Sequence, residues 1–152
     1  MTEPADSVPH GQADQTGGLF VGGVPLLVLV LDSITEAIGI GAGCVVISGS
    51  HGGISAGRFA LQARVMMAVF NDAGVGLDQA GIAALALLQA EGVAACTVSH
   101  HTARIGDAQS TLNTGVISHA NARALLFGAR AGLALRDWLF SVTGSEWSPA
   151  RR

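Results

Sequence analysis

The sequence contains no lysine and no tyrosine, and only 12% of its 152 residues are charged. Soluble domains usually carry about twice that share of charged residues. The eight basic residues are all arginine, and two of them end the chain. A net charge of −3 and the lack of any other basic cluster do not fit a nucleic-acid-binding protein, so we predict no nucleic-acid partner.

Cysteines and long apolar stretches are also scarce. Cys44 and Cys96 are too few for a disulfide scaffold, and their apolar surroundings predict buried thiols rather than reactive ones. The longest apolar run, residues 24–31, is far shorter than the roughly 20 residues that a membrane-spanning helix needs. Residues 1–18 are polar and acidic and lack the features of a secretory signal. We therefore expect a cytoplasmic protein with no membrane partner.

Hydrophobic residues, at 49%, and 21 glycines dominate the composition instead. A chain of this size with few charges to expose is expected to bury surface against copies of itself or against a partner subunit. The alternative explanation is a general bias of the sequence toward glycine and alanine. The composition therefore favours a homo-oligomer or a subunit without proving either.

Apolar segments typical of buried parallel strands alternate along the chain with segments of helical pattern. The predicted strands are 25–31, 44–48, 65–70 and 93–98, and the predicted helices are 33–39 (a short helix or turn), 55–63, 78–90 and a long last helix from about 115 or 121 to 140. This alternation predicts an α/β, three-layer fold with a small, mostly parallel sheet of four to five strands and helices on both faces.

The predicted domain organisation is simple. One α/β domain covers residues 19–143, between a disordered tail at residues 1–18 and a C-terminal tail at residues 144–152. The fifth strand, if present, is expected near residues 19–21. Asp78 is the expected N-cap of the helix that it begins.

The long last helix supports an alternative function. Arg123, Arg130 and Asp137 would fall on one stripe of it, and nearly all of its remaining surface is apolar. Gly128 and Gly132 would let another backbone approach closely. Such a helix either packs on its own sheet or lies at an interface. In the second case the protein is a non-catalytic structural or regulatory subunit that assembles through this helix.

Polar residues gather after the predicted strands, whereas the turns that lead into the strands contain few candidate polar residues. Ligands of open parallel sheets bind at the carboxyl ends of the strands, so this edge is the expected site. The alternative is that these residues only cap the helices that follow. The candidate catalytic residues are His51, Asp72 and Asp32, and the candidate substrate-binding residues are Ser48, Ser50, Gly52, Gly53, Asn71, Arg104 and Asp107.

Each group of candidates suits a particular chemistry. The glycine-rich residues 48–53 would turn backbone amides at a helix start toward a carboxylate, a phosphate or a developing oxyanion. Asp72 suits acid–base work, metal binding or the orientation of a histidine, and otherwise it would hold an Asx turn. Arg104 would clamp a carboxylate unless Asp107 pins it.

Several alternatives stay open at this edge. Adjacent side chains of an extended chain point to opposite sides, so one of His100 and His101 is expected to face the site, and the sequence does not say which. The spacing of the acidic residues and histidines matches no compact metal motif, so the binding of a metal or cofactor is left open. No G-x-S-x-G elbow accompanies the serines, which argues against a serine nucleophile.

The stretch CVVISGSHGG, followed by VMMAVFNDAGVG, resembles the layout of the caspase-like fold, in which a His-Gly pair follows one parallel strand. The resemblance covers residues 44–98. It implies that His51 matches the catalytic histidine and that Asp72 stands near the place of the nucleophilic cysteine. Cysteine-protease activity would then be in doubt or lost.

Together these interpretations predict a small-molecule-binding α/β protein. A hydrolase or an acid–base enzyme, acting on a small anionic or amide-bearing metabolite at the carboxyl edge of the sheet, fits the candidate residues. Hydrolysis and proton abstraction next to a carbonyl both suit these groups.

Overall fold

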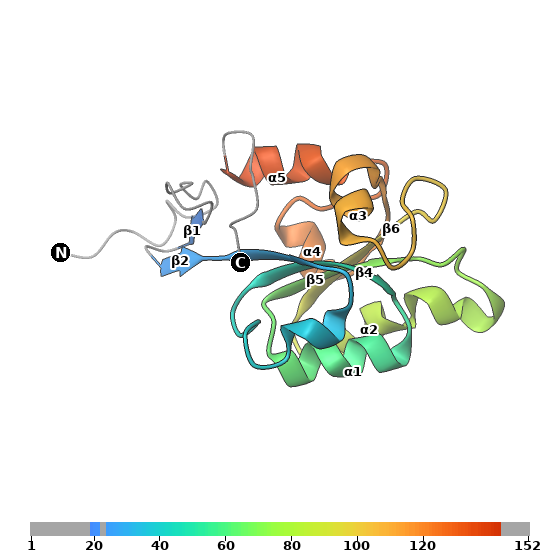
Figure 1. Ribbon diagram of the computed structural model, residues 1–152, viewed down its shortest axis with the longest axis horizontal. Coiled ribbons are helices and arrows are strands. Elements are labelled where there is room, and N and C mark those ends of the chain that lie inside the picture. Colours follow the sequence, from blue (N-terminus) through green and yellow to red (C-terminus); the bar gives the residue numbers. More distant parts are fainter. Residues whose placement is uncertain (1–18, 22–23, 144–152) are drawn as a thin grey trace.

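A computed structural model describes residues 19–21 and 24–143 of the chain. The tails predicted at residues 1–18 and 144–152 lie outside the described residues. A mostly parallel sheet with helices on both faces forms the centre of the described chain (Figure 1). The predicted three-layer α/β fold is confirmed.

The five strands of the main sheet in the described chain occur in the order β3-β4-β5-β6-β7, which is also their order in the sequence. They are β3 (Val28–Leu31), β4 (Val45–His51), β5 (Met67–Asn71), β6 (Ala94–Val98) and β7 (Ile117–Ala120). The first four run parallel, and β7 pairs antiparallel with β6. Every residue of β5 and β6 is buried, as their mainly apolar sequences predict for strands covered on both faces.

The connections between the parallel strands cover one face of the sheet. They contain η2 (Ile34–Ala37), α1 (Ile54–Ala63) and α2 (Ala83–Ala90), which share one apolar cluster with the strands around Phe70. Parallel crossovers are right-handed, so a sheet whose strands follow sequence order places all of them on the same face. This arrangement leaves the other face to the C-terminal third of the chain.

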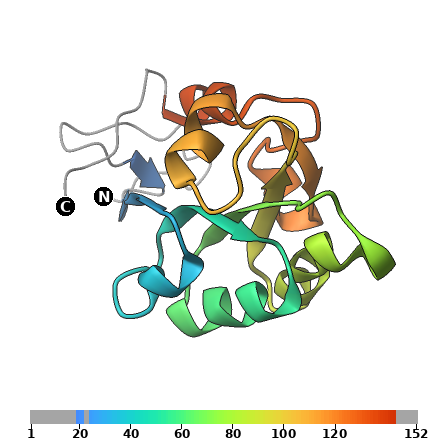
Figure 2. The same cartoon turned by 45° about the vertical axis from the view of Figure 1, so that its right-hand side comes forward.

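That other face is covered by α3 (Ala108–Thr114), α4 (Ala122–Leu126) and α5 (Leu135–Thr143) (Figures 1 and 2). Their apolar side chains join the sheet in a second buried cluster that includes Trp138. The indole Nε1 of Trp138 donates a hydrogen bond of 2.8 Å to the carbonyl of Phe127, which satisfies its polar atom. Two apolar clusters, one on each face, thus hold the three layers together.

The predicted long last helix is wrong. The segment forms β7, α4 and the start of α5 instead, and a backbone bridge joins Val116 to Ala134. Two positive φ angles, +85° at Gly128 and +92° at Gly132, interrupt any continuous helix. Asn121 begins α4 as a new N-cap, with its side chain accepting from the amide of the third helical residue.

This correction changes the interface argument. Arg123, Arg130 and Asp137 do not share a helical stripe, because Arg123 lies in α4, Asp137 lies in α5 and Arg130 lies between these helices. The two glycines mark turns rather than a close helix–helix approach. The helix that supported the subunit alternative is therefore absent.

Two predictions near the other elements are also wrong in detail. The fifth strand of the main sheet is β7, whereas β1 (Leu19–Val21) pairs antiparallel with β2 (Val24–Leu26) in a separate sheet. Asp78 is not an N-cap, because it lies inside η3 (Leu77–Ile82) with a φ of 54°, and α2 begins only at Ala83. The close backbone packing around η3, rather than the capping preference of Asp78, determines the conformation of this segment.

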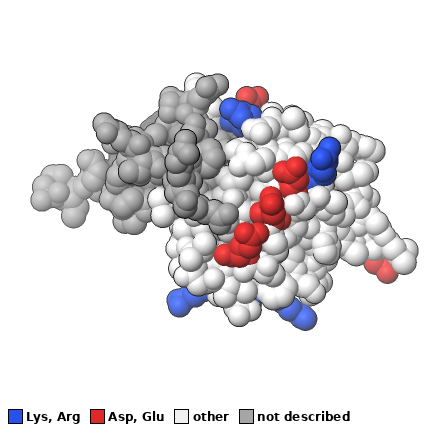
Figure 3. Space-filling model, in the orientation of Figure 1, with Lys and Arg blue, Asp and Glu red and all other residues white. Residues whose placement is uncertain are grey.

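The surface agrees with the low charge content. In the view of Figure 3, charged residues form a few small, separate groups on a mainly uncharged surface. Large apolar side chains are exposed in several places, most strongly Leu77 at 85% and Leu126 at 77%. Within the described residues, no helix has the length and apolar character that crossing a membrane requires.

Candidate functional site

The carboxyl ends of β4 and β5 do not pair regularly. Their register is regular up to Ile47 and Val69, and then shifts so that His51 pairs with Asn71. The bulge in β4 brings its end toward the start of α3, where a Cβ atom on Gly49 would overlap the amide nitrogen of Asp107. The bulge re-aims the end of β4, so that His51 is exposed beside the start of α1.

A hollow of about 430 Å³ opens at this end of β4. Its walls come from His51, from the first residues of α1 and from parts of residues 73–83. A Cβ atom on Gly52 would lie 2.6 Å from the carbonyl oxygen of Gly81, so the two backbones approach this closely because residue 52 has no side chain. The predicted binding residue Gly52 therefore lies behind the hollow, where it lets the end of β4 approach Gly81, and Gly53 and Gly81 are among the residues that line the hollow.

The start of α1 faces this hollow. Its N-cap, Gly53, provides no side-chain oxygen to the first turn, and the first helical bond runs from the amide of Gly57 to the carbonyl of Gly53. Helix amides at this position and the helix dipole both favour a negatively charged or partly negative oxygen. A Cβ atom on Gly53 would lie 3.2 Å from Nε2 of His51, so the imidazole lies directly over this helix start.

The opposite wall has an unusual backbone. Six of the seven residues from 73 to 79 have positive φ angles, including 66° at the β-branched Val75. Such conformations are strained for residues other than glycine, and they persist where the surrounding structure imposes them. Two hydrogen bonds of 2.7 Å hold the segment, from the amide of Val75 to the carbonyl of Asp72 and from the amide of Gly81 to the carbonyl of Val75. η3 and this segment project from the edge of the sheet (Figures 1 and 2).

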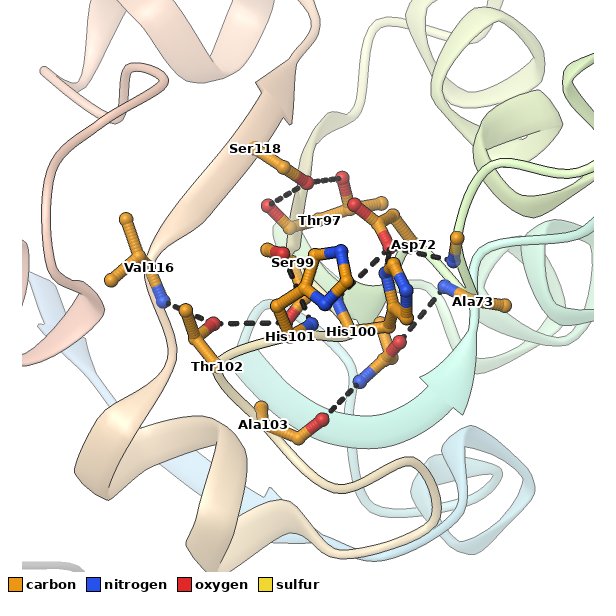
Figure 4. Close-up of polar contacts among 12 residues, drawn as sticks. Asp72, Ala73, Thr97, Ser99, His100, His101, Thr102, Ala103, Val116 and Ser118 are labelled. Carbon is orange, nitrogen blue, oxygen red and sulfur yellow. Dashed lines mark hydrogen bonds and ion pairs between the residues drawn. The ribbon is translucent and has the colours of Figure 1, made fainter.

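Asp72 lies at the end of β5 and is only 4% exposed. Its Oδ1 accepts hydrogen bonds from the amide of Gly74, at 2.8 Å, and from the amide of His100, at 3.0 Å (Figure 4). Nδ1 of His100 lies 3.3 Å from the same oxygen. The predicted catalytic carboxylate thus contacts His100, and the structure records no direct contact between Asp72 and His51 within the described chain.

The hydrogen bonds around Asp72 decide its ionisation. Burial by itself raises the pKa of this carboxyl group, because it disfavours the charged form. Hydrogen bonds from the Gly74 amide, the Ser118 hydroxyl, and the amide and ring of His100 outweigh burial and lower the pKa below its ordinary value. Asp72 is therefore a carboxylate at neutral pH.

This lowered pKa makes a prediction about acid stability. The stabilisation that the Asp72 carboxylate provides is complete above the ordinary pKa of aspartate, about 3.9, and is lost as the pH falls through the lower pKa of the folded state. We expect the urea midpoint of the wild type to exceed that of Asp72→Asn at pH 7, and the difference to shrink as the pH falls below about 4. An unchanged difference across this range would contradict the lowered pKa.

The two adjacent histidines lie on the same side of the chain. Their ring centroids are 3.9 Å apart and the rings are tilted by 40°. The expectation that they point to opposite sides is wrong because they lie in a turn, not in an extended strand. The amides of Thr102 and Ala103 both donate to the carbonyl of Ser99, which closes this turn.

Two predicted serines are used by the scaffold. Ser48 is fully buried and its hydroxyl donates a hydrogen bond of 2.8 Å to the carbonyl of Val69 on β5. The hydroxyl of Ser50 accepts from the amide of Ile34 at 3.0 Å and so fixes the start of η2. Neither hydroxyl belongs to the walls of the hollow.

Asn71 is also buried and joins two loops. Its side-chain amide donates to the carbonyl of Ala103, at 3.0 Å, and its carbonyl oxygen accepts from the amide of Ala73, at 2.8 Å. The first bond places the turn that carries His100 beside the end of β5. Asn71 therefore positions the site rather than presenting itself to a ligand.

The remaining candidates lie around the start of α3. Oδ1 of Asp32 accepts from the amide of Ala108, at 2.9 Å, and Oδ1 of Asp107 caps the helix through the amide of Ser110, at 3.0 Å. Arg104 is exposed, and its backbone amide donates to the hydroxyl of Ser110. These residues anchor α3 to the sheet, and the structure does not bring them into the walls of the hollow.

One participant in the site could not be found from the sequence. Ser118 reaches Asp72 from β7, and its hydroxyl also lies 2.9 Å from that of Thr97. β7 falls within the segment predicted as helix, and its four residues, ISHA, show neither the alternation nor the apolar run that identifies a strand.

Thiol and metal chemistry receive no support at this edge. Burial raises the pKa of the Cys96 thiol to about 12 and also raises that of Cys44. Within the described residues, no group of three or more histidine, cysteine, aspartate or glutamate side chains could hold a metal ion. No family model, curated protein or solved structure matches this chain.

Proposed function

We propose that this chain binds a small molecule that carries a carboxylate, phosphate or carbonyl oxygen in the hollow at the end of β4. The oxygen would accept hydrogen bonds from the first amides of α1, and His51 would donate a proton to it or take one from it. The rest of the molecule would contact the apolar lining, which includes Ile54, Val75 and Ala83. Acid–base chemistry on a small anionic or amide-bearing compound is the activity that suits these groups.

One observation carries this proposal: the imidazole of His51 lies over a helix start whose N-cap has no side chain, and both line the same hollow. A helix start that no protein side chain caps can receive an external acceptor. The strained wall at residues 73–79 supports the proposal, because such backbone conformations concentrate at functional sites.

Titration calorimetry with acetate and with inorganic phosphate tests the proposal. We expect one of these anions to bind the wild type. His51→Ala should raise the Kd of that anion about tenfold, because the variant loses about one charge-assisted hydrogen bond. Ala83→Leu should occupy part of the hollow and weaken binding. His101→Ala serves as the control, because it removes an exposed imidazole outside the hollow. Equal affinity in Ala83→Leu and wild type, or no binding of either anion, would refute the proposal.

A further inference from the structure

The contact between Asp72 and His100 takes no part in the proposed function, and its geometry points to chemistry of its own. The side chain of His100 is 43% exposed, whereas that of Asp72 is 6% exposed. Nδ1 of His100 lies 3.3 Å from Oδ1 of Asp72, and a carboxylate at this position favours the neutral ring that carries its proton on Nδ1. Nε2 then carries the lone pair on a ring that solvent reaches.

The carboxylate in this pair is fixed from several directions. The backbone amides of Gly74 and His100 both donate to it, so its position does not depend on the histidine ring alone. The arrangement is preorganised, as a base that acts without rearrangement requires.

The backbone around His100 limits what the pair can do. The backbone amides of residues 100–104 all donate hydrogen bonds within the protein. The acceptors are Asp72 Oδ1 for the first amide and the Ser99 hydroxyl for the second. The third and fourth amides donate to the Ser99 carbonyl, and the fifth donates to the Ser110 hydroxyl. None of these five amides is free to stabilise the oxyanion of an ester or amide hydrolysis. Proton abstraction that is followed by loss of a delocalised leaving group from the same molecule develops no localised oxyanion, so a placed base is sufficient.

We propose that Asp72 and His100 form a general-base pair that removes a proton from a carbon acid, a compound with an acidic C–H bond whose electron pair expels a delocalised leaving group from the same molecule. The C–H bond breaks, its proton forms a bond to Nε2 of His100, and the electron pair stays on the substrate. Asp72, a positioning residue, stabilises the resulting imidazolium. The proton then returns to the product or to water, which restores the neutral ring.

The probe for this activity is 5-nitrobenzisoxazole. Removal of the C–H proton of its isoxazole ring breaks the N–O bond. The C–H electron pair completes a nitrile, and the N–O electron pair stays on the oxygen of a coloured nitrophenolate. We expect the wild type to exceed the rate constant of free imidazole at equal concentration. His100→Ala should lower the rate about a hundredfold, within the range that a placed base contributes, and Asp72→Asn about tenfold.

Two controls separate the pair from a merely exposed histidine. His101→Ala removes a neighbouring exposed imidazole, which has no carboxylate partner among the described residues, and should keep most of the rate. In ¹⁵N spectra, His100 should carry its proton on Nδ1 in the neutral form. A rate no higher than that of imidazole, an equal loss in His101→Ala, or a proton on Nε2 would overturn the inference. Anion binding to the hollow is measured separately and can survive that result.

Discussion

Asn121→Ala is expected to lower the free energy of unfolding by about 3–5 kcal/mol. The side chain of Asn121 makes four hydrogen bonds to the backbone. Its oxygen accepts from the amides of Ala95 and Ala124, and its amide donates to the carbonyls of Leu85 and Val93, all at 2.9 to 3.1 Å. One side chain thus joins β6, α2 and α4. Alanine would leave four backbone groups without these partners in a place where water does not easily replace them.

Chemical denaturation measures this loss, and Asn113→Ala provides the matched control. Asn113 is an exposed residue of α3 that accepts one hydrogen bond from Arg136. Its replacement should change the free energy of unfolding by less than about 0.5 kcal/mol. Similar losses in both variants would mean that the four bonds of Asn121 do not hold the elements together.

Gly81→Ala is expected to lower the free energy of unfolding by about 3 kcal/mol or more and to weaken anion binding in the hollow. A Cβ atom at this position would overlap the carbonyl oxygen of Asp72 and would lie 3.1 Å from that of Val75. Both are backbone atoms, so no side chain can turn aside to make room. The segment between Asp72 and η3 would have to move away, and with it one wall of the hollow.

Gly43→Ala separates this steric effect from the general effect of losing a glycine. Gly43 has a φ of +72° and nothing within 4 Å of an added Cβ atom. Gly43→Ala should lower the free energy of unfolding by about 1 kcal/mol, because of backbone strain alone, and should leave anion binding unchanged. Thermal unfolding and calorimetry of the two variants decide the matter. A smaller loss for Gly81→Ala than for Gly43→Ala would show that the close approach at η3 is not important.

The sequence indicated the parallel sheet because unbroken apolar strands between helical segments are a strong and local signal. β4, β5 and β6 all lie close to the predicted positions. The C-terminal third was mispredicted because β7 has only four residues, and Gly128 and Gly132 sit at spacings that a helix also tolerates. What decides there is pairing with β6, which is a long-range contact.

At the candidate site, too, local sequence signals identified some features, whereas long-range contacts determine the others. The rule that ligands bind at strand carboxyl ends directed attention to His51 and Asp72, and the structure places both at that edge. Which histidine meets Asp72 depends on the turn that follows β6 and on a hydrogen bond from Asn71 to that turn. No local pattern in the sequence encodes such a contact.

The strand order has a consequence for how the chain is made. Each strand of the main sheet pairs with the strand that precedes it in the sequence, from β3 through β7. A ribosome that releases the chain from its N-terminus would deliver every new strand to an edge that is already formed. No strand has to wait for a distant partner or be inserted between two others. We expect assembly to proceed in the direction of synthesis, with β7 adding last.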